Sequence, residues 1–450
     1  MIAELCIEST ALGELRRLLD SKVEQCAVLL ASRAERASGL VRLLVREVVF
    51  PDADSYQVQT NTNAQLSPKF VATLAKHAKL QRLSLIFVHT HPGGLSSEFS
   101  LTDDAGEVAL KAFLDVRGVP GPHAALVIGD QGLRCRALGE RYEVQVIGLG
   151  AKRTIEYSPA KSAGESHTAS PGSEIFDRQV RAFGAAGQAQ LEALKVAIVG
   201  VGGTGSIAAQ QLVHLGVKDF ILIDPDTIEA TNLNRVVGAT KRDVGRAKTA
   251  VAQRYLEDFR PDISVRAVRA NVVHDQVARE LTEADLILSC TDSHGSRSVI
   301  QQVAYQYMIP CIDIGSTIAQ SQGRITGIFG RVQCLSPGLA CLWCSSLLDS
   351  AQVRRDMSND VERQLDPYIV DAGEPAPSVI SLNGTLVSMA VSMVLGLVTD
   401  APIDARYLIY NASNSTLRSV KRAANPTCFI CSKVGALGWG DARPLFTRRD

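Results

Sequence analysis

The sequence lacks an excess of charge of either sign. Its 450 residues include 47 lysines and arginines and 47 aspartates and glutamates. A surface that binds nucleic acid through bulk electrostatics needs a basic excess, which this chain does not have. We therefore expect no nucleic-acid partner.

The chain also lacks the usual features of an export signal or a membrane anchor. Residues 1–4 lead directly into mixed sequence, without a basic segment followed by an apolar run. We therefore expect no secretory signal, and a cytoplasmic location. The one apolar stretch long enough to span a membrane covers residues 378–398, and polar residues interrupt it at Asn383, Thr385, Ser388 and Ser392. This composition favours a buried helix, so we expect no membrane partner.

The chain is too long for one hydrophobic core, so two domains are expected. Apolar periodicity stops within residues 156–173, where the sequence SPAKSAGESHTASPGS is rich in serine, alanine, glycine and proline. Such composition is typical of a linker. We predict an N-terminal domain over residues 1–155, a linker over 156–173 and a C-terminal domain over 174–450.

Both domains are predicted to be α/β. In the first, apolar patterning predicts helices over 12–19 and 102–114 and strands over 24–31, 40–50, 83–88 and 124–128. In the second, it predicts strands over 195–199, 220–223, 286–289 and 311–314, with a helix over 206–215. The strand, helix and strand over 195–223 predict a doubly wound, Rossmann-like parallel sheet.

A glycine-rich loop stands between the strand over 195–199 and the following helix. Its sequence is Gly200-Val201-Gly202-Gly203-Thr204-Gly205, and Asp224 ends the next strand about twenty residues further on. Glycines allow the backbone to approach a phosphate, and the helix N-terminus attracts its charge. By itself this pattern predicts a nucleotide site, and a dehydrogenase would be the default interpretation.

Four further blocks change that interpretation. They are FDRQVRAFG over residues 176–184, DPD over 224–226 with EATNLNR over 229–235, GRAK over 245–248, and CTD over 290–292. Taken in order with the glycine loop, they resemble the ubiquitin-activating enzyme superfamily, including the ThiF- and MoeB-type adenylyltransferases of the thiamine and molybdopterin pathways. The resemblance covers residues 174–435. The series from Asn232 to Arg235 has no role in hydride transfer, which disfavours a dehydrogenase.

The resemblance implies roles for these residues. Arg235 and Lys248 match the phosphate-binding positions, and Asp292 matches the catalytic aspartate that coordinates magnesium. Asp224 matches the ribose ligand, with Asp226 and Asn232 as further nucleotide contacts. Cations at the triphosphate suit the chemistry, because a carboxylate that attacks phosphorus must overcome charge repulsion.

Arg178 matches the arginine that dimers of the superfamily insert into the partner's active site, so the resemblance implies a homodimer. An exposed basic residue on a helix is more often an ordinary surface charge. The same alternative applies to Arg235 and Lys248 taken singly.

Ten cysteines are not expected to form disulfides in a cytoplasmic chain. Four of them form two CxxC pairs, Cys341 with Cys344 and Cys428 with Cys431, which suits a structural zinc ion without an open coordination position. A redox role is the alternative. The other six are expected to be small buried hydrophobes, namely Cys6, Cys26, Cys135, Cys290, Cys311 and Cys334.

The segment between the two CxxC pairs lacks a cysteine. Superfamily members that form a thioester carry a catalytic cysteine there, so residues 366–378 resemble a crossover loop without its nucleophile. We expect the reaction to stop at the acyl-adenylate, which then passes to a partner. Ser378 is an alternative acceptor, although serine is a poor nucleophile without an adjacent base.

A histidine motif marks the N-terminal domain. His89-Thr90-His91-Pro92, followed by Ser100-Leu101-Thr102-Asp103, resembles the JAMM (Mov34-type) metalloproteases that cleave ubiquitin and ubiquitin-like proteins, whose domain has a cytidine-deaminase-like fold. The resemblance implies zinc held by His89, His91 and Asp103, with one position left for water. Two histidines buried at a strand end are the alternative interpretation.

The remaining catalytic groups are less sharply defined. Glu24 matches the glutamate that takes a proton from the zinc-bound water, with Glu47 as its competitor, and Ser100 matches the serine that stabilises the oxyanion. Eight residues separate His91 from Ser100, one more than in the family pattern, so Asp104 competes with Asp103 as the ligand.

The two resemblances together predict ATP-dependent adenylation of the C-terminal glycine of a ubiquitin-like protein, coupled to a zinc-dependent peptidase or isopeptidase that acts on the same protein. A conjugating enzyme or a sulfurtransferase would be a further partner. Activation of a sulfur carrier for thiocarboxylate formation is the alternative function. A catalytically silent scaffold is disfavoured because Lys248 and Asp292 are both present.

Overall fold

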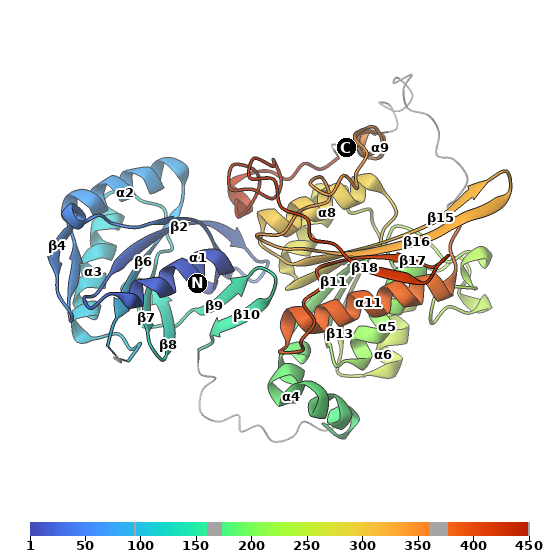
Figure 1. Cartoon of the computed structure of the whole chain (residues 1–450), viewed down its shortest axis with the longest axis horizontal. Coiled ribbons are helices and arrows are strands. Elements are labelled where there is room, and N and C mark those ends of the chain that lie inside the picture. Colours follow the sequence, from blue (N-terminus) through green and yellow to red (C-terminus); the bar gives the residue numbers. More distant parts are fainter. Residues whose placement is uncertain (94–95, 160–172, 360–376, 449–450) are drawn as a thin grey trace. The chain divides into compact units, whose positions relative to one another are not determined.

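The computed structural model describes residues 1–93, 96–159, 173–359 and 377–448. The chain forms two compact units (Figure 1). Unit 1 comprises Met1–Ser166, Gln306–Met308 and Ala436–Pro444, and unit 2 comprises His167–Tyr305, Ile309–Gly435 and Leu445–Asp450. The predicted linker overlaps the end of a strand, Arg153–Tyr157, and its residues 160–172 lie outside the described part of the chain.

Unit 1 is built on an eight-stranded mixed sheet in the order β10-β9-β1-β3-β2-β6-β7-β8. The strands are β1 (Ile2–Glu8), β2 (Cys26–Glu35), β3 (Val41–Val49), β6 (Ser84–His91), β7 (Ala124–Gly129), β8 (Gly132–Ala137), β9 (Gln145–Leu149) and β10 (Arg153–Tyr157). A short hairpin of β4 (Tyr56–Gln59) and β5 (Ala64–Leu66) stands apart from this sheet. The sequence patterning predicted four of these strands, with β6 extending three residues further than expected to include both histidines.

Helices cover both faces of this sheet. Helix α1 (Ser9–Arg16) packs through Leu12 and Leu15 on one face, while α2 (Pro68–Gln81) and α3 (Leu101–Val116) pack on the other. Along β2, Ala27, Leu29 and Ala31 face α1, and Val28 and Leu30 face α2 and α3. Burial on both faces explains why β2 is a continuous apolar run rather than an alternating one.

The segment Ala436–Pro444 completes unit 1 at β2 and β3. The Ser32 hydroxyl donates to the Gly438 carbonyl, and the Glu35 amide donates to the Asp441 carboxylate over 2.7 Å. The Arg46 guanidinium lies 3.5 Å from the centre of the Trp439 ring. The sequence patterning had assigned this segment to the second domain, because nothing in its spacing reports a long-range contact.

Unit 2 is built on a second eight-stranded sheet in the order β13-β12-β11-β14-β15-β16-β17-β18. Its strands are β11 (Lys195–Val199), β12 (Asp219–Ile223), β13 (Ser264–Val268), β14 (Leu286–Ser289), β15 (Cys311–Ser321), β16 (Arg324–Leu335), β17 (Tyr407–Asn411) and β18 (Thr416–Ser419). The strands from β13 to β15 are parallel, as predicted, but β16, β17 and β18 are antiparallel. The parallel part thus agrees with the predicted doubly wound sheet, and the three antiparallel strands extend it at one edge.

The chain order reverses at β11, which lies between β12 and β14. Ligands of open α/β sheets bind at the carboxyl ends of the strands at such a point. Helices α5 (Gly203–His214) and α6 (Lys248–Phe259) lie on one face with α11 (Ile380–Val398), and α8 (His294–Gln306) lies on the other (Figure 1).

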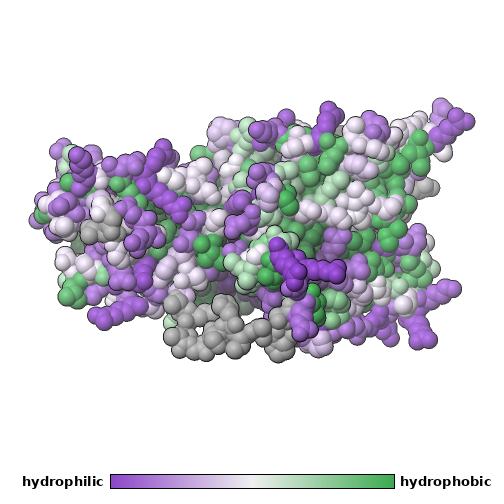
Figure 2. All heavy atoms as spheres, turned by 60° about the horizontal axis from the view of Figure 1, so that its bottom comes forward, coloured by the Kyte–Doolittle hydropathy of each residue, from purple (hydrophilic) through white to green (hydrophobic). Residues whose placement is uncertain are grey.

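Helix α11 is the one described helix that is long and apolar enough to cross a membrane. It packs against α5, β15 and β16, and its residues Leu386, Ala390 and Val394 belong to the main core of unit 2. The stretch is thus a core helix, as its sequence predicted. On the face that Figure 2 shows, apolar residues are interspersed with polar ones.

Candidate functional site

The glycine loop of unit 2 has a geometry that larger residues cannot adopt. A Cβ atom on Gly205 would lie 1.8 Å from the Gly200 carbonyl oxygen, and one on Gly200, whose φ is +87°, would lie 2.7 Å from the Cys290 carbonyl oxygen. Gly202 is the N-cap of α5, and Gly203 is its first residue. The loop therefore presents backbone amides and a helix N-terminus at the carboxyl end of β11, where a phosphate is stabilised.

Asp224 connects this loop to the end of β12. Its carboxylate is buried and accepts the Val201 amide over 2.7 Å and the Asp226 amide over 2.9 Å. Burial raises the pKa of Asp224, and the nearby Lys248 opposes that shift. Asp224 thus holds the loop in shape besides lying where a ribose ligand is expected.

The predicted cations lie around the same loop. The Lys248 ammonium donates to the Asp226 carboxylate over 2.8 Å, at the first turn of α6. Arg235 lies against Gly203, since a Cβ atom there would come within 3.1 Å of its side-chain carbons. The Arg235 guanidinium donates to the Thr231 carbonyl over 2.6 Å.

The other three predicted residues differ in their placement. Asp292 is exposed and follows Cys290, whose carbonyl adjoins the glycine loop, so it shares the carboxyl edge of the sheet. The buried Asn232 uses its side-chain oxygen to accept the Glu229 amide over 3.1 Å, which gives it a turn-capping role that the sequence did not predict. Arg178 is exposed on α4 (Asp177–Glu192).

A buried ionic cluster that the sequence patterning did not reveal lies beside this edge. Asp313 on β15 is fully buried, accepts the Ser289 hydroxyl over 2.8 Å and pairs with Arg297 and Arg331. Burial opposes ionisation, but Arg331 and Arg297 together hold the pKa of Asp313 below its ordinary value. A charged residue inside the apolar strand sequence CIDI was the available signal.

The four predicted zinc-binding cysteines come together. Their sulfur atoms all lie within 4.8 Å of one another, with Cys341 3.6 Å from Cys428 and Cys344 3.6 Å from Cys431. Backbone amides point at the sulfurs, as Ile430 does at Cys428 over 3.4 Å. A hydrogen bond from Cys341 lowers the pKa of Cys431 to about 5. Four sulfur atoms gathered at these distances fit a tetrahedral zinc ion with no open position.

The histidine motif of unit 1 forms a second compact cluster. The Nε2 atoms of His89 and His91 lie 3.2 Å apart, and the Asp103 carboxylate lies 3.3 Å from His89 Nε2. The three candidate ligand atoms lie within 4.8 Å of one another. His91 Nδ1 contacts the Ser96 carbonyl over 2.6 Å, which fixes the ring orientation. Two imidazoles and one carboxylate fit a catalytic zinc ion with an open position.

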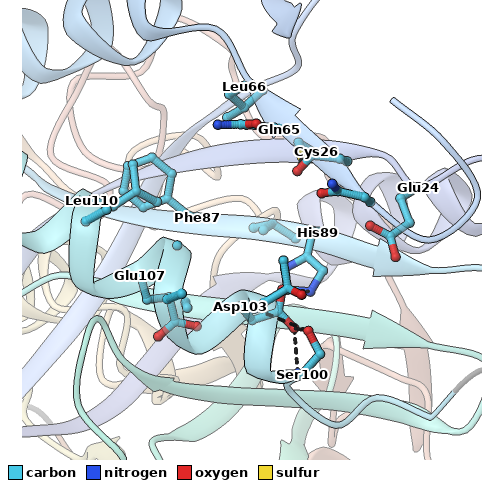
Figure 3. Close-up of a pocket in the computed structure, with 18 of the residues that line it drawn as sticks. Glu24, Cys26, Gln65, Leu66, Phe87, His89, Ser100, Asp103, Glu107 and Leu110 are labelled. Atoms are coloured by element: carbon cyan, nitrogen blue, oxygen red, sulfur yellow. Dashed lines mark hydrogen bonds and ion pairs between the residues drawn. The ribbon is translucent and has the colours of Figure 1, made fainter. Parts of the chain in front are cut away.

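The structure distinguishes between the competing carboxylates. Glu24 lines the same cavity as His89 (Figure 3). Glu47 is exposed and lies 3.9 Å from His77. Burial raises the pKa of Glu24, and the two histidines oppose that shift. Asp103 faces His89, whereas Asp104 pairs with Arg136 over 2.7 Å.

Ser100 has a local role. Its hydroxyl donates to Asp103 Oδ2 over 2.8 Å and accepts the Asp103 amide over 3.2 Å, forming a capping box at the start of α3. The other oxygen, Oδ1, remains directed at His89. Ser100 therefore positions Asp103, whether or not it also contacts an oxyanion.

Arg136 forms a supporting layer that the sequence did not reveal. It donates to both oxygens of the buried Glu107, pairs with Asp104 and covers the Phe99 ring at 3.8 Å. Phe99 in turn meets His89 edge to face. The Arg136 guanidinium therefore holds the first turns of α3 in place, and through Phe99 it also supports the ring of His89, a candidate metal ligand.

Comparison with known proteins identifies the second unit. A model of the ThiF family matches residues 176–430. The chain belongs to the ThiF family. The matched range contains the glycine loop, Lys248, Asp292 and three of the four clustered cysteines, and it ends one residue before Cys431. The histidine cluster lies outside that range, so its interpretation depends on its geometry.

Two relatives of this ThiF-family chain show how far the similarity extends. The molybdopterin-synthase adenylyltransferase of Escherichia coli is 30% identical over 261 residues, which cover 57% of this chain and 96% of the relative. The SAMP-activating enzyme E1 of Haloferax volcanii is 27% identical, covering 56% of this chain and 85% of the relative. Among solved structures, Escherichia coli MccB with ATP is similar at a TM-score of 0.45 and 21% identity, covering 61% of this chain and 77% of that one.

Proposed function

We propose that unit 2 adenylates the C-terminal carboxylate of a ubiquitin-like or sulfur-carrier protein at the expense of ATP. The observation that carries the proposal is the grouping of the glycine loop, Asp224, Arg235 and Lys248 at the chain-order reversal of the sheet. The family membership and the names of the two relatives support the same reaction class.

In this proposal, the loop amides and the N-terminus of α5 bind the phosphates of ATP. Arg235 and Lys248 offset the negative charge that repels the incoming carboxylate. An oxygen of that carboxylate forms a bond to the α-phosphorus, the bond from this phosphorus to the bridging oxygen breaks, and pyrophosphate leaves. Asp292 would hold magnesium, which neutralises the leaving pyrophosphate.

The test is ATP–pyrophosphate exchange by the full chain with magnesium and ubiquitin-like or sulfur-carrier proteins that end in glycine. Exchange should require the carrier protein, and a carrier lacking its last glycine should not support it. Exchange that is independent of any carrier protein would contradict the proposal. Mass spectrometry of the carrier then separates an acyl-adenylate from a thiocarboxylate, which decides between ligation and sulfur transfer.

We further propose that Arg178 acts on the site of a second copy, as the family resemblance implies. Phe183 and Gly184 interrupt α4 with non-helical backbone angles, so the part that carries Arg178 is separated from the rest of the helix. The measurement is complementation: mixed Arg178→Ala and Lys248→Ala chains should regain exchange that each lacks alone. No recovery on mixing would count against the shared site.

The histidine cluster supports a second function, which we propose to be zinc-dependent hydrolysis of a peptide or isopeptide bond by unit 1. Zinc, when bound, supplies an activated water and polarises the scissile carbonyl. Glu24, in the wall of the same cavity, accepts the proton from that water and passes it to the leaving amine. His89, His91 and Asp103 would hold the ion.

Metal content provides the test of this second function. The full chain should bind two zinc ions, and Cys344→Ser and His91→Ala should each remove one. Only the His91→Ala chain should lose cleavage of a carrier protein extended beyond its glycine. Cleavage that persists without the ion at His91 would exclude the metallopeptidase assignment. Taken together, we propose that both sites act on the same carrier protein in the cytoplasm.

A further inference from the structure

The cavity that contains the histidine cluster continues well beyond it. Its volume is about 870 Å³, and His89, His91, Asp103 and Glu24 occupy only one part of its wall. Figure 3 shows Phe87 and Leu110 next to each other, away from the group formed by His89, Asp103 and Ser100. The remainder of the cavity is therefore a second space that is continuous with the candidate metal position.

The walls of this second space are mainly apolar. Phe87 and Ala125 line it from β6 and β7, together with Leu66, Val71, Leu110 and Phe113, and Gln65 adds an amide next to Leu66 (Figure 3). Glu107 also lines the cavity, but Arg136 pairs with it over 2.9 Å, so no free carboxylate is offered to a basic side chain. Such a space favours an aliphatic or aromatic group over a lysine or arginine.

Small residues on α3 create the space. Ala105, Gly106 and Ala109 line the cavity, and a Cβ atom on Gly106 would meet nothing within 4 Å. These three residues are exposed, so they border the open side of the cavity, whereas Leu110 and Phe113 line it from the same helix. Val108, which is 59% exposed, lies on α3 but does not line the cavity.

We propose that this space binds a large apolar side chain of the residue that follows the scissile bond. The inference depends on the proposed metallopeptidase function. If both units act on the same carrier protein, unit 2 requires that the carrier end in glycine after cleavage. Glycine then precedes the scissile bond, and it has no side chain that could fill the cavity. Of the two residues joined by the scissile bond, the apolar one is therefore on the leaving side. The substrate class is a carrier-protein precursor in which glycine precedes leucine, phenylalanine or a similar residue.

The reaction is an ordinary hydrolysis. The bond between the glycine carbonyl carbon and the leaving nitrogen breaks, the hydroxyl of water joins the carbonyl carbon, and a proton goes to the leaving amine. The apolar pocket binds the side chain of the leaving residue. The gain in kcat/KM from this binding therefore depends on the size of that side chain. Filling the pocket with a phenylalanine instead of an alanine should raise kcat/KM at least about ten-fold.

The experiment uses the zinc-loaded full chain and peptides in which glycine is followed by Phe, Leu, Ala or Gly, together with a glycine–lysine isopeptide. Cleavage should be fastest for Phe and Leu. Ala109→Phe fills the pocket from α3 and should abolish the preference, measured as the ratio of kcat/KM for the Gly–Phe and Gly–Ala peptides. Val108→Phe adds the same ring to α3 at a residue that does not line the cavity, and should leave this ratio and the basal cleavage unchanged.

Binding gives a readout without turnover. A peptide that begins with phenylalanine should bind the metal-free chain, and Ala109→Phe should weaken this binding at least about ten-fold while Val108→Phe does not. Equal cleavage of all peptides, or faster cleavage of the isopeptide, would overturn the pocket assignment alone. Absence of any cleavage with zinc bound would overturn the peptidase function and this inference together.

Discussion

The candidate site of unit 1 is formed by side chains, whereas that of unit 2 is formed mainly by the backbone. In unit 1, side chains from separate elements meet directly, as His89 and Asp103 do at 3.3 Å. In unit 2, the site is mainly backbone: a glycine loop, a helix N-terminus and amides held by Asp224. A site made of side chains depends on a few residues and on the neighbours that hold them in place. A site made of backbone depends on glycines, which have no Cβ atom to block the close approach of the chain.

The largest expected effect is a separation of the two activities. Lys248→Ala removes the ammonium beside the glycine loop, so ATP–pyrophosphate exchange should fall at least about 100-fold while peptide cleavage is retained. His89→Ala removes a candidate zinc ligand, so cleavage should be lost while exchange is retained. Both rates are measured on the same preparations.

Two exposed residues provide controls for this pair. Lys241→Ala removes an exposed lysine from the same region of unit 2, and His77→Ala removes a half-exposed histidine from α2. Both variants should retain both activities. Loss of exchange and cleavage together in Lys248→Ala or His89→Ala would mean that the sites are not separate.

The backbone character of the second site predicts the effect of Gly205→Ala. The added methyl group would lie 1.8 Å from the Gly200 carbonyl oxygen, so the loop must open. ATP affinity, measured by titration calorimetry, should fall about 100-fold because the amides no longer converge on the phosphates. Gly384→Ala on α11 meets nothing within 4 Å and should leave affinity unchanged. Normal ATP binding by Gly205→Ala would refute the backbone interpretation.

The side-chain character of the first site predicts the effect of Arg136→Met. This change removes the contacts to Asp104 and Glu107 while retaining an apolar stem over Phe99. Zinc affinity of unit 1, measured against a chromophoric chelator, should fall about 10- to 100-fold. Arg141→Met, at a side chain that is 88% exposed, is the matched control. A lower melting temperature with unchanged zinc affinity would reduce Arg136 to a purely structural role.

The smallest effect concerns pH and stability in unit 1. Burial lowers the pKa of His123 to about 4, from 6.5, and its Nδ1 accepts the Leu85 amide over 3.0 Å. The unfolded chain binds a proton near pH 6.5 and the folded chain does not, so this stabilisation is present above pH 6.5 and is lost as the pH falls toward 4.

Chemical denaturation of unit 1 should therefore show a loss of about 1 kcal/mol between pH 7 and 5.5. His123→Asn retains an acceptor for the Leu85 amide but should flatten this dependence, whereas His77→Ala should not. An equal slope in the wild-type and His123→Asn chains would assign the effect to other groups.

Much of both sites was predictable because each motif is contiguous or regularly spaced. The glycine loop, the two CxxC pairs and the sequence from His89 to Asp103 all report local geometry, and the structure brings each group together. The extra residue between His91 and Ser100 did not displace Asp103, since the capping box with Ser100 fixes the start of α3.

What the sequence could not predict arises from contacts between distant residues. The pairing of Arg136 with Glu107 and the burial of Asp313 between two arginines depend on which strands and helices meet, and no spacing rule encodes that. Strands β16 to β18 were also missed, although β15 with β16 and β17 with β18 form hairpins of neighbouring segments, and only the pairing of β16 with β17 joins distant residues. The capping role of Asn232 was hidden because its short side chain suits both a turn and a ligand.

The inclusion of Ala436–Pro444 in unit 1 has a consequence for biosynthesis. The guanidinium groups of Arg46 and Arg443 both lie over the Trp439 ring, and the Asp441 carboxylate accepts the Glu35 amide of β2. During translation, β2 and β3 emerge from the ribosome several hundred residues before this covering segment is made. The first unit to be synthesised is thus not complete until the C-terminal segment is made, and a nascent chain that stalls before residue 436 would expose the part of β2 and β3 that this segment covers.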